Sequence, residues 1–367
     1  MEKVSVLGVG RLGLCLALTF ERAGFDVVGS DIREDYVDSI NNRTFVSYEP
    51  DVEKYLSEAG NFKATTVLKE AVEHSDLLFV TVRTESLPDG QYNQSQVEQL
   101  LGDLSKLGKV NEKHLIISCN VNPGYSDQIQ EHMSKYGYIV SYNPEWVAQG
   151  TILYNQAYPD LVVIGEADKN AGNVIERVYR KVCLNNPVIH RMDRLSAELT
   201  KVALNCYLTT KISYANMIGE IAIKSGVDAA PILAAVGDDS RVNPKYFRYG
   251  FGYGGPCFPR DNKALVQYAR NAGVDPLISK AVMKINENHL EFQLAEFKRT
   301  HKKTEPVVFE SVTYKPGTVI IEESQQLLYA VRIAQDGYKV IIREHPEVIR
   351  QVKELYGDLF NYETREI

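Results

Sequence analysis

The chain has 367 residues, of which 24% are charged, and a formal net charge of −7. This is ordinary globular composition with material for two or three cores, and no basic block indicates a nucleic-acid partner. The five cysteines are odd in number, widely spaced and without a CxxC pair. That pattern disfavours a disulfide framework and a zinc site, and it favours a reducing compartment. The N-terminus lacks the two segments of a signal peptide, and its apolar run is too short to span a membrane, so we expect a cytoplasmic protein without membrane or metal.

Strand and helix patterns alternate over the first part of the chain. Apolar runs predict strands at residues 3–7, 25–31, 76–82, 114–119, 138–143 and 160–165, and helical patterns lie between them, as at 11–24 and 94–107. Alternating elements of this length predict a parallel sheet with helices on both faces. The fold class is therefore α/β, with a doubly wound Rossmann-like domain over residues 1–192.

The pattern changes near Asp193. Apolar residues then recur at helical spacing from residue 194 to Gly226, which predicts a helix about 45 Å long at about 1.5 Å per residue. Such a helix is a natural spine between domains or subunits. More helices are predicted at 229–236, 262–271 and 276–299, followed by strand and helix patterns from 307 to 356. We expect an all-helical central domain over residues 193–300 and a short C-terminal α/β domain over residues 301–367.

A glycine motif follows the first predicted strand. It fits G-x-G-x-x-G with Gly8, Val9, Gly10, Arg11, Leu12 and Gly13, opens a helix, and precedes a second strand that ends at Asp31. In this context the glycines allow backbone N–H groups to approach a pyrophosphate, and the acid binds ribose hydroxyls. The motif predicts NAD rather than NADP, a preference that Arg33 weakens slightly. The alternative is a structural glycine turn that binds nothing.

A second motif, "GFGYGGPCFPRD" at residues 250–261, carries one cysteine. Cys257 precedes a predicted helix with Pro259 in its first turn, and both the helix N-terminus and Arg260 favour the thiolate. This arrangement suits a nucleophile, although a buried cysteine in a tight loop is the alternative. An NAD site and a reactive thiol together predict a four-electron oxidation, in which cysteine captures an aldehyde as a thiohemiacetal that becomes a thioester and then an acid.

Six segments match the motifs of one family in the right order: "VRTE" (82–85), "NPEWVAQG" (143–150), "ELTKVALNCYL" (198–208), "DSRV" (239–242), "GYGGPCFPRD" (252–261) and "TYKPGTVIIEES" (313–324). On these segments the chain resembles the UDP-glucose/GDP-mannose dehydrogenase family over nearly its whole length. The resemblance implies an NAD-dependent nucleotide-sugar 6-dehydrogenase that acts as a homodimer. UDP-glucose is the expected substrate, with GDP-mannose and UDP-N-acetylhexosamines as alternatives.

The resemblance also implies roles for individual residues. Cys257 matches the nucleophile, Glu145 the carboxylate of thioester hydrolysis, and Asp261 a carboxylate near the catalytic water. Lys201 and Asn205 match the pair that stabilises the oxyanion, and their spacing of four places them on one helix face. The expected cofactor-binding residues are those of the glycine motif with Asp31, Arg33, Thr84, Asn120, Gln149 and Arg260. The expected substrate-binding residues are Glu145, Trp146, Val147, Lys201, Asn205, Arg241, Tyr246, Phe247, Tyr249, Gly250, Gly254 and Lys315, of which Arg241 reaches the sugar across the dimer interface.

Some positions depart from the family pattern. Asn120 and Gln149 stand where the family has threonine and glutamate, and Glu322 stands near a position where it has arginine. The C-terminal domain is also expected to be shortened relative to the family. These departures keep two other hypotheses open. One is a two-electron β-hydroxyacid-type dehydrogenase that uses Lys201 and Asn205 without a thiol, and the other is a non-catalytic nucleotide binder.

Overall fold

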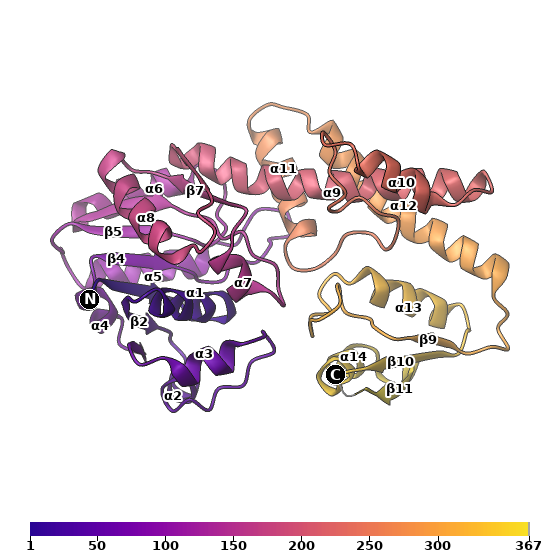
Figure 1. Cartoon of the computed structure of the whole chain (residues 1–367), viewed down its shortest axis with the longest axis horizontal. Coiled ribbons are helices and arrows are strands. Elements are labelled where there is room, and N and C mark those ends of the chain that lie inside the picture. Colours follow the sequence, from indigo (N-terminus) through magenta and orange to yellow (C-terminus); the bar gives the residue numbers. More distant parts are fainter. Residues whose placement is uncertain (366–367) are drawn as a thin grey trace. The chain divides into compact units, whose positions relative to one another are not determined.

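The computed structural model describes residues 1–365, and Figure 1 shows the path of the chain. The chain forms two compact units, one over Met1–Lys201 and a second that starts at Val202. The boundary falls within helix α9 (Arg194–Lys224), which is the long helix that the sequence predicted. Within residues 1–365, no helix combines the length and the apolar character that crossing a membrane requires.

The first unit contains an eight-stranded sheet in the order β3-β2-β1-β4-β5-β6-β7-β8. Its strands are β1 (Lys3–Leu7), β2 (Asp26–Ser30), β3 (Phe62–Thr65), β4 (Leu77–Val80), β5 (Lys113–Ile117), β6 (Tyr138–Tyr142), β7 (Leu161–Gly165) and β8 (Val188–Met192). Neighbouring strands are parallel except β6 and β7, which form an antiparallel pair between Tyr142 and Gly165. The predicted α/β class and mainly parallel sheet are confirmed.

Helices cover both faces of this sheet. They are α1 (Arg11–Arg22), α2 (Glu34–Asn41), α3 (Val52–Glu58), α4 (Leu68–His74), α5 (Ser95–Lys106), α6 (Tyr125–Met133), α7 (Ile152–Ala157) and α8 (Lys169–Val182), with a 3-10 turn at Ser134–Tyr136. One core packs α1 and α8 against strand residues such as Val6 and Ile116. The other packs α4, α5 and α6 against Leu7 and Ile117. Adjacent strand residues thus enter opposite cores, which explains why these strands read as continuous apolar runs.

The second unit begins with the rest of α9 and three more helices. These are α10 (Ala229–Gly237), α11 (Phe258–Asn271) and α12 (Leu277–Thr300). Residues from α9 and α10 form a small core with Phe247, while Leu290, Leu294 and Phe297 of α12 join the core of the C-terminal part. The central helices therefore lie where the sequence predicted them.

The C-terminal part is a three-stranded parallel sheet in the order β11-β10-β9, with two helices. Its elements are β9 (Val307–Phe309), α13 (Gln325–Gln335), β10 (Val340–Glu344), α14 (Pro346–Tyr356), a 3-10 turn at Gly357–Leu359, and β11 (Asn361–Thr364). Strand β9 ends three residues earlier than predicted. The N–H of Val312 donates to the Glu344 carboxylate at 3.2 Å instead of continuing the ladder.

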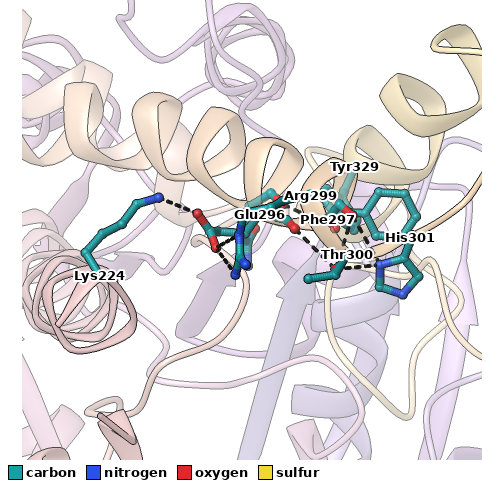
Figure 2. Close-up of polar contacts among 8 residues, drawn as sticks. Lys224, Glu296, Phe297, Arg299, Thr300, His301 and Tyr329 are labelled. Atoms are coloured by element: carbon teal, nitrogen blue, oxygen red, sulfur yellow. Dashed lines mark hydrogen bonds and ion pairs between the residues drawn. The ribbon is translucent and has the colours of Figure 1, made fainter. Parts of the chain in front are cut away.

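The end of α12 is tied to its neighbours by polar and aromatic contacts (Figure 2). The carboxylate of Glu296 bonds Lys224 at the end of α9 and Arg299 one turn further along α12. The ring of His301 stacks on Phe297 with 4.1 Å between centroids, and Phe297 also meets Tyr329 of α13 edge-on. These contacts fix the exit of α12 toward β9 within the second unit.

Candidate active site

The glycine turn after β1 has the geometry that a dinucleotide needs. Gly8 has φ of +96°, and a Cβ on Gly13 would lie 2.1 Å from the Gly8 carbonyl oxygen. Only glycine therefore fits at these positions. A Cβ on Gly10 would meet nothing within 4 Å, and no side chain caps the start of α1 there. The open helix N-terminus suits a pyrophosphate, so the residues present fit NAD.

Asp31 lies directly after β2 and is held by Arg33. The guanidinium of Arg33 donates to both carboxylate oxygens of Asp31, at 2.8 and 2.9 Å, and stacks over Tyr36 with 3.9 Å to the ring centre. The Asp31 side chain is only 9% exposed, whereas that of Arg33 is 55% exposed. The pair holds the carboxylate in place directly after β2, which suits hydrogen bonds to ribose hydroxyls.

One further predicted cofactor residue, Gln149, lies near this turn in the first unit. The amide of Gln149 accepts from Arg11 of the glycine motif at 3.4 Å, so the structure brings these two residues together. Glu49, which the sequence did not single out, anchors the same segment because its buried carboxylate accepts from the N–H groups of Gly150 and Ile152, both at 2.7 Å. Thr84 is buried and Asn120 is half-buried.

Glu145 follows β6 and points its side chain into a buried polar network. Gln156 donates to one carboxylate oxygen at 3.1 Å, and the Tyr179 hydroxyl lies 3.3 Å from the other. Thr19 donates to the oxygen of the Gln156 amide at 3.0 Å and thereby orients its nitrogen toward Glu145. Glu145 also lines a cavity of about 20 Å³, which has room for one water molecule.

The environment of Glu145 disfavours its charged form. Burial raises the pKa of this carboxyl above its ordinary value, and the hydrogen bonds from Gln156 and Tyr179 and the charge of Lys201 offset only part of that rise. A carboxyl whose pKa is moved toward neutrality is suited to accept a proton near physiological pH. Tyr179 and Gln156 were not predicted, because nothing in the local sequence links them to Glu145.

The Lys201 side chain is held by the backbone of Glu145. Its ammonium donates to the backbone carbonyl of Glu145 at 2.7 Å and lies 4.7 Å from the ring centre of Trp146. The side chain is buried, so its charge is stabilised by a carbonyl dipole and an aromatic face rather than mainly by water. The structure thus joins Lys201, Glu145 and Trp146, three of the predicted site residues. Val147, next in the chain, packs against the core.

A single face of α9 carries a row of polar side chains with a spacing of three or four residues. They are Glu198, Lys201, Asn205, Thr209, Ser213, Asn216 and Glu220. The first six are buried, and they bond groups outside the helix: Asn205 and Thr209 both bond α11, whereas Ser213 bonds α12. Glu198, for example, accepts from the N–H groups of Gly124 and Ser126 at the start of α6. Only Lys201 and Asn205 of this row were predicted as site residues, although the polar periodicity of the row can be read in the sequence.

The cysteine loop leads directly into α11. Cys257 is the N-cap residue of this helix, Pro259 lies in its first turn, and no side chain caps the helix start. Close packing requires the glycine two residues before Cys257, since a Cβ on Gly255 would lie 2.4 Å from the ring of Tyr314. Cys257 is half-buried, whereas the other four cysteines are buried.

Asn205 and Asp261 meet in the interior of the second unit. The Asn205 amide donates to the Asp261 carboxylate at 2.5 Å, and Arg260 lies 3.4 Å from the other carboxylate oxygen. The N–H of Asp261 donates to the carbonyl of Cys257 at 2.8 Å, which is the first helical bond of α11. The structure therefore brings together Cys257, Asn205, Asp261 and Arg260, all predicted from the sequence.

The remaining predicted substrate residues occupy loops of the second unit. Tyr246 is exposed with φ of +63°, Phe247 is buried, and Tyr249 packs against Gly219 of α9. Arg241 is highly exposed, and the Nε and Nη2 groups of its guanidinium donate to the two carboxylate oxygens of Asp239. A Cβ on Gly254 would lie 2.1 Å from the carbonyl oxygen of Glu323, and the carbonyl of Lys315 accepts from Thr313 and Thr318.

Comparisons with known proteins relate this arrangement to one family. Sequence models of the UDP-glucose/GDP-mannose dehydrogenase family match its NAD binding domain to residues 2–183 and its central domain to residues 195–288. The chain belongs to this family. A solved UDP-glucose dehydrogenase from the hyperthermophilic archaeon Pyrobaculum islandicum is 30% identical, with a TM-score of 0.89, and the match covers 99% of this chain and 86% of that one. NAD is accordingly the cofactor of this member.

Curated relatives carry two different substrate names. UDP-glucose 6-dehydrogenase YwqF of Bacillus subtilis is 29% identical, over 90% of this chain and 77% of its own. GDP-mannose 6-dehydrogenase of Pseudomonas aeruginosa is also 29% identical, over 93% of this chain and 80% of its own. Membership of the family therefore establishes an NAD-dependent nucleotide-sugar 6-dehydrogenase without identifying the sugar nucleotide.

Replacing Asp31 with alanine is expected to weaken NAD binding by about tenfold to a hundredfold, because charged hydrogen bonds to the ribose are lost. The change also releases Arg33 from its partner and removes the repulsion of a 2′-phosphate, so selection against NADP should relax. Equilibrium binding of both cofactors measures this. Asp35→Ala, at an exposed position in α2, is the matched control. Unchanged constants for both cofactors would contradict the assignment of Asp31.

Replacing Glu145 with glutamine is expected to make stability less dependent on pH. Because the pKa of Glu145 is raised in the folded state, the folded protein binds more protons than the unfolded chain above the unfolded-state pKa of about 4.3. The free energy of unfolding of the wild type therefore falls as pH rises from the unfolded-state pKa through the raised folded-state pKa. Glu145→Gln has no carboxyl at this position, so its free energy of unfolding lacks this decrease. Its Tm should exceed that of the wild type at neutral pH by about 2–4 °C. The exposed control Glu73→Gln should show the same dependence of Tm on pH as the wild type. If Tm of Glu145→Gln also followed pH in parallel with the wild type, burial of the Glu145 carboxyl would not lower stability at neutral pH.

Proposed function

We propose that this enzyme oxidises the C6 alcohol of a nucleotide-bound hexose to the carboxylate through a cysteine-bound intermediate, with UDP-glucose as its substrate. Each turnover converts one alcohol, one water and two NAD into one carboxylate, two NADH and three protons. In this proposal residues 1–192 bind NAD, residues 193–300 supply the nucleophile, and residues 301–367 contribute to the nucleotide-sugar site.

Each proposed catalytic residue has a defined task. Bound NAD supplies the acceptor for the hydride that leaves C6 in each oxidation. The Cys257 thiolate forms a bond to C6 of the aldehyde, and Lys201 and Asn205 stabilise the negative charge that develops on the carbonyl oxygen. After the second oxidation C6 is a thioester. Water attacks it, Glu145 accepts the proton of that water, the C–S bond breaks, and Cys257 leaves as a thiolate.

The observation that carries this proposal is the position of Cys257. Its sulfur sits at the start of α11, and the helix-oriented N–H groups there favour the anionic form of a thiol. Asp261, one turn later, is bonded to Asn205, so the turn that presents the cysteine is tied to the part of α9 that lies in the same unit. A two-electron dehydrogenase needs no thiol at such a place.

The proposal is tested with a panel of nucleotide sugars and NAD, measuring NADH and the acid product. UDP-glucose should give two NADH per sugar and UDP-glucuronate. A higher kcat/KM for GDP-mannose or a UDP-N-acetylhexosamine would overturn the substrate assignment and keep the mechanism. One NADH per sugar would overturn the four-electron mechanism, and no turnover with any of them would overturn the catalytic proposal.

We also propose that two copies pair through α9. Tyr207, Tyr214 and Ile221 follow one another at intervals of seven residues and are 49–57% exposed, so they form an apolar stripe on the helix surface. The exposed guanidinium of Arg241 would then reach the sugar site of the partner copy.

Introducing charge into this stripe is expected to separate the copies. Light scattering should report a dimer for the wild type and a monomer for Tyr214→Glu/Ile221→Glu, with a dissociation constant raised at least about tenfold. Tyr154→Glu, at another exposed tyrosine in α7, is the control and should remain dimeric. A monomeric wild type would end the proposal, as would a double variant that still dimerises with wild-type affinity.

A further inference from the structure

A buried histidine in α12 lies between two acceptors. His289 is 1% exposed, its Nδ1 is 2.6 Å from a carboxylate oxygen of Glu220, and its Nε2 is 2.6 Å from the backbone carbonyl oxygen of Gly250. A carbonyl oxygen can only accept, and an ionised carboxylate can only accept. With an ionised Glu220, both ring nitrogens donate, which requires two protons on the ring and a positive charge.

The alternative is a neutral histidine beside a protonated Glu220. The structure favours the ion pair, because the Glu220 side chain is 24% exposed and water stabilises its negative charge. Glu296, a second carboxylate that acts on the neighbouring Tyr249, is already paired with Lys224 and Arg299. Tyr249, whose ring meets His289 edge-on, stays neutral because burial and the carboxylates of Glu220 and Glu296 raise its pKa.

The acceptor carbonyl belongs to the loop that leads to Cys257. Gln293 of α12 donates to the same Gly250 oxygen at 3.1 Å, and Asn216 of α9 accepts from the Gly250 N–H at 3.0 Å. Asn286 bonds both the N–H and the carbonyl of Tyr253, at 2.9 and 3.0 Å. The loop backbone is thus held by side chains from two helices, and His289 contributes the charged donor.

We propose that His289 is a positioning residue that, as an imidazolium paired with Glu220, fixes Gly250 and thereby orders the cysteine loop. A neutral imidazole has one donor, so loss of a proton leaves one acceptor facing a ring lone pair at 2.6 Å. With a neutral ring the loop is held less firmly, and the nucleophile is less well placed. The inference rests on the proposed function only for its effect on turnover.

The protonation state is tested directly by NMR of protein labelled with ¹⁵N-histidine, with the His289 signals assigned from their loss in His289→Gln. At near-neutral pH both ring nitrogens should carry protons in the wild type. In Glu220→Gln the carboxylate that fixes the second proton is gone, and a single-proton ring is expected. A wild-type His289 with one ring proton at near-neutral pH would overturn the proposal.

The positioning role is tested by hydrogen exchange and kinetics of His289→Gln. The Gly250 and Tyr253 amides should exchange about tenfold faster than in the wild type, and kcat should fall by a similar factor while NAD binding is unchanged. His190→Gln, at an exposed histidine in β8, is the control. Wild-type amide exchange in His289→Gln would overturn the positioning role.

These measurements separate this inference from the proposed function. The NMR state of the ring and the exchange of the loop amides need no substrate. If the proposed chemistry failed but the NMR and exchange results were as expected, His289 would still order the loop. If two NADH per sugar were found but the His289 ring were neutral, the proposed chemistry would stand and the role of His289 would not.

Discussion

Replacing Cys257 with serine is expected to stop acid formation while leaving NAD binding nearly unchanged. A serine hydroxyl at the N-cap position of α11 is far less acidic than a thiol, so far less of it is present as the anionic nucleophile. Without the covalent adduct the aldehyde is not converted to a thioester. Production of acid should fall by at least about 10³-fold, the scale on which loss of a nucleophile acts.

The measurement is NADH and acid released per sugar, together with the equilibrium constant for NAD. Cys183→Ser is the matched control, since burial raises the pKa of that thiol to about 11 and makes it a poor nucleophile. The control should still yield two NADH per sugar. A Cys257→Ser enzyme with full turnover would refute covalent catalysis, and one with lost NAD binding would indicate a damaged fold instead of a missing nucleophile.

The parts of this fold that could be predicted are those in which local pattern and burial coincide. Strands such as β1 and β5 are buried on both faces and read as apolar runs, so they were found. Strands β3 and β8 were missed because they are the edges of the sheet and carry polar residues such as Lys63, His190 and Arg191. An edge strand contacts water, which removes the apolar signal.

The candidate site divides in a similar way. The residues that match family motifs could be located, and the turn geometry around Gly8 and Gly13 fits the expected dinucleotide. The partners of Glu145 and the residues that hold the cysteine loop could not be located from the sequence. For the loop the reason is that His289 and Asn286 bond backbone atoms, and a sequence does not indicate which backbone carbonyl a side chain will bond. The polar face of α9 could be predicted in part, because the sequence shows the spacing of its polar residues but does not show that they are buried.

Replacing Lys201 with methionine is expected to lower kcat by about 10²–10³-fold with little change in substrate KM. The ammonium is buried beside the Glu145 carbonyl and the Trp146 ring, where little water screens it. A charge in such a place acts most strongly on the negative charge that develops on the carbonyl oxygen in the transition state. The loss should therefore appear in kcat, because the ground-state substrate carries no such charge.

Methionine keeps an unbranched stem against Trp146, so the packing of this part of α9 should survive and the circular dichroism and Tm should change little. Lys224→Met is the matched control, because Lys224 lies at the C-terminal end of the same helix. Its side chain is exposed and bonds Glu296 of α12. It should retain wild-type kcat. If Lys201→Met also kept kcat within about threefold, the buried ammonium would have to be assigned to holding the Glu145 backbone, and oxyanion stabilisation would fall to Asn205.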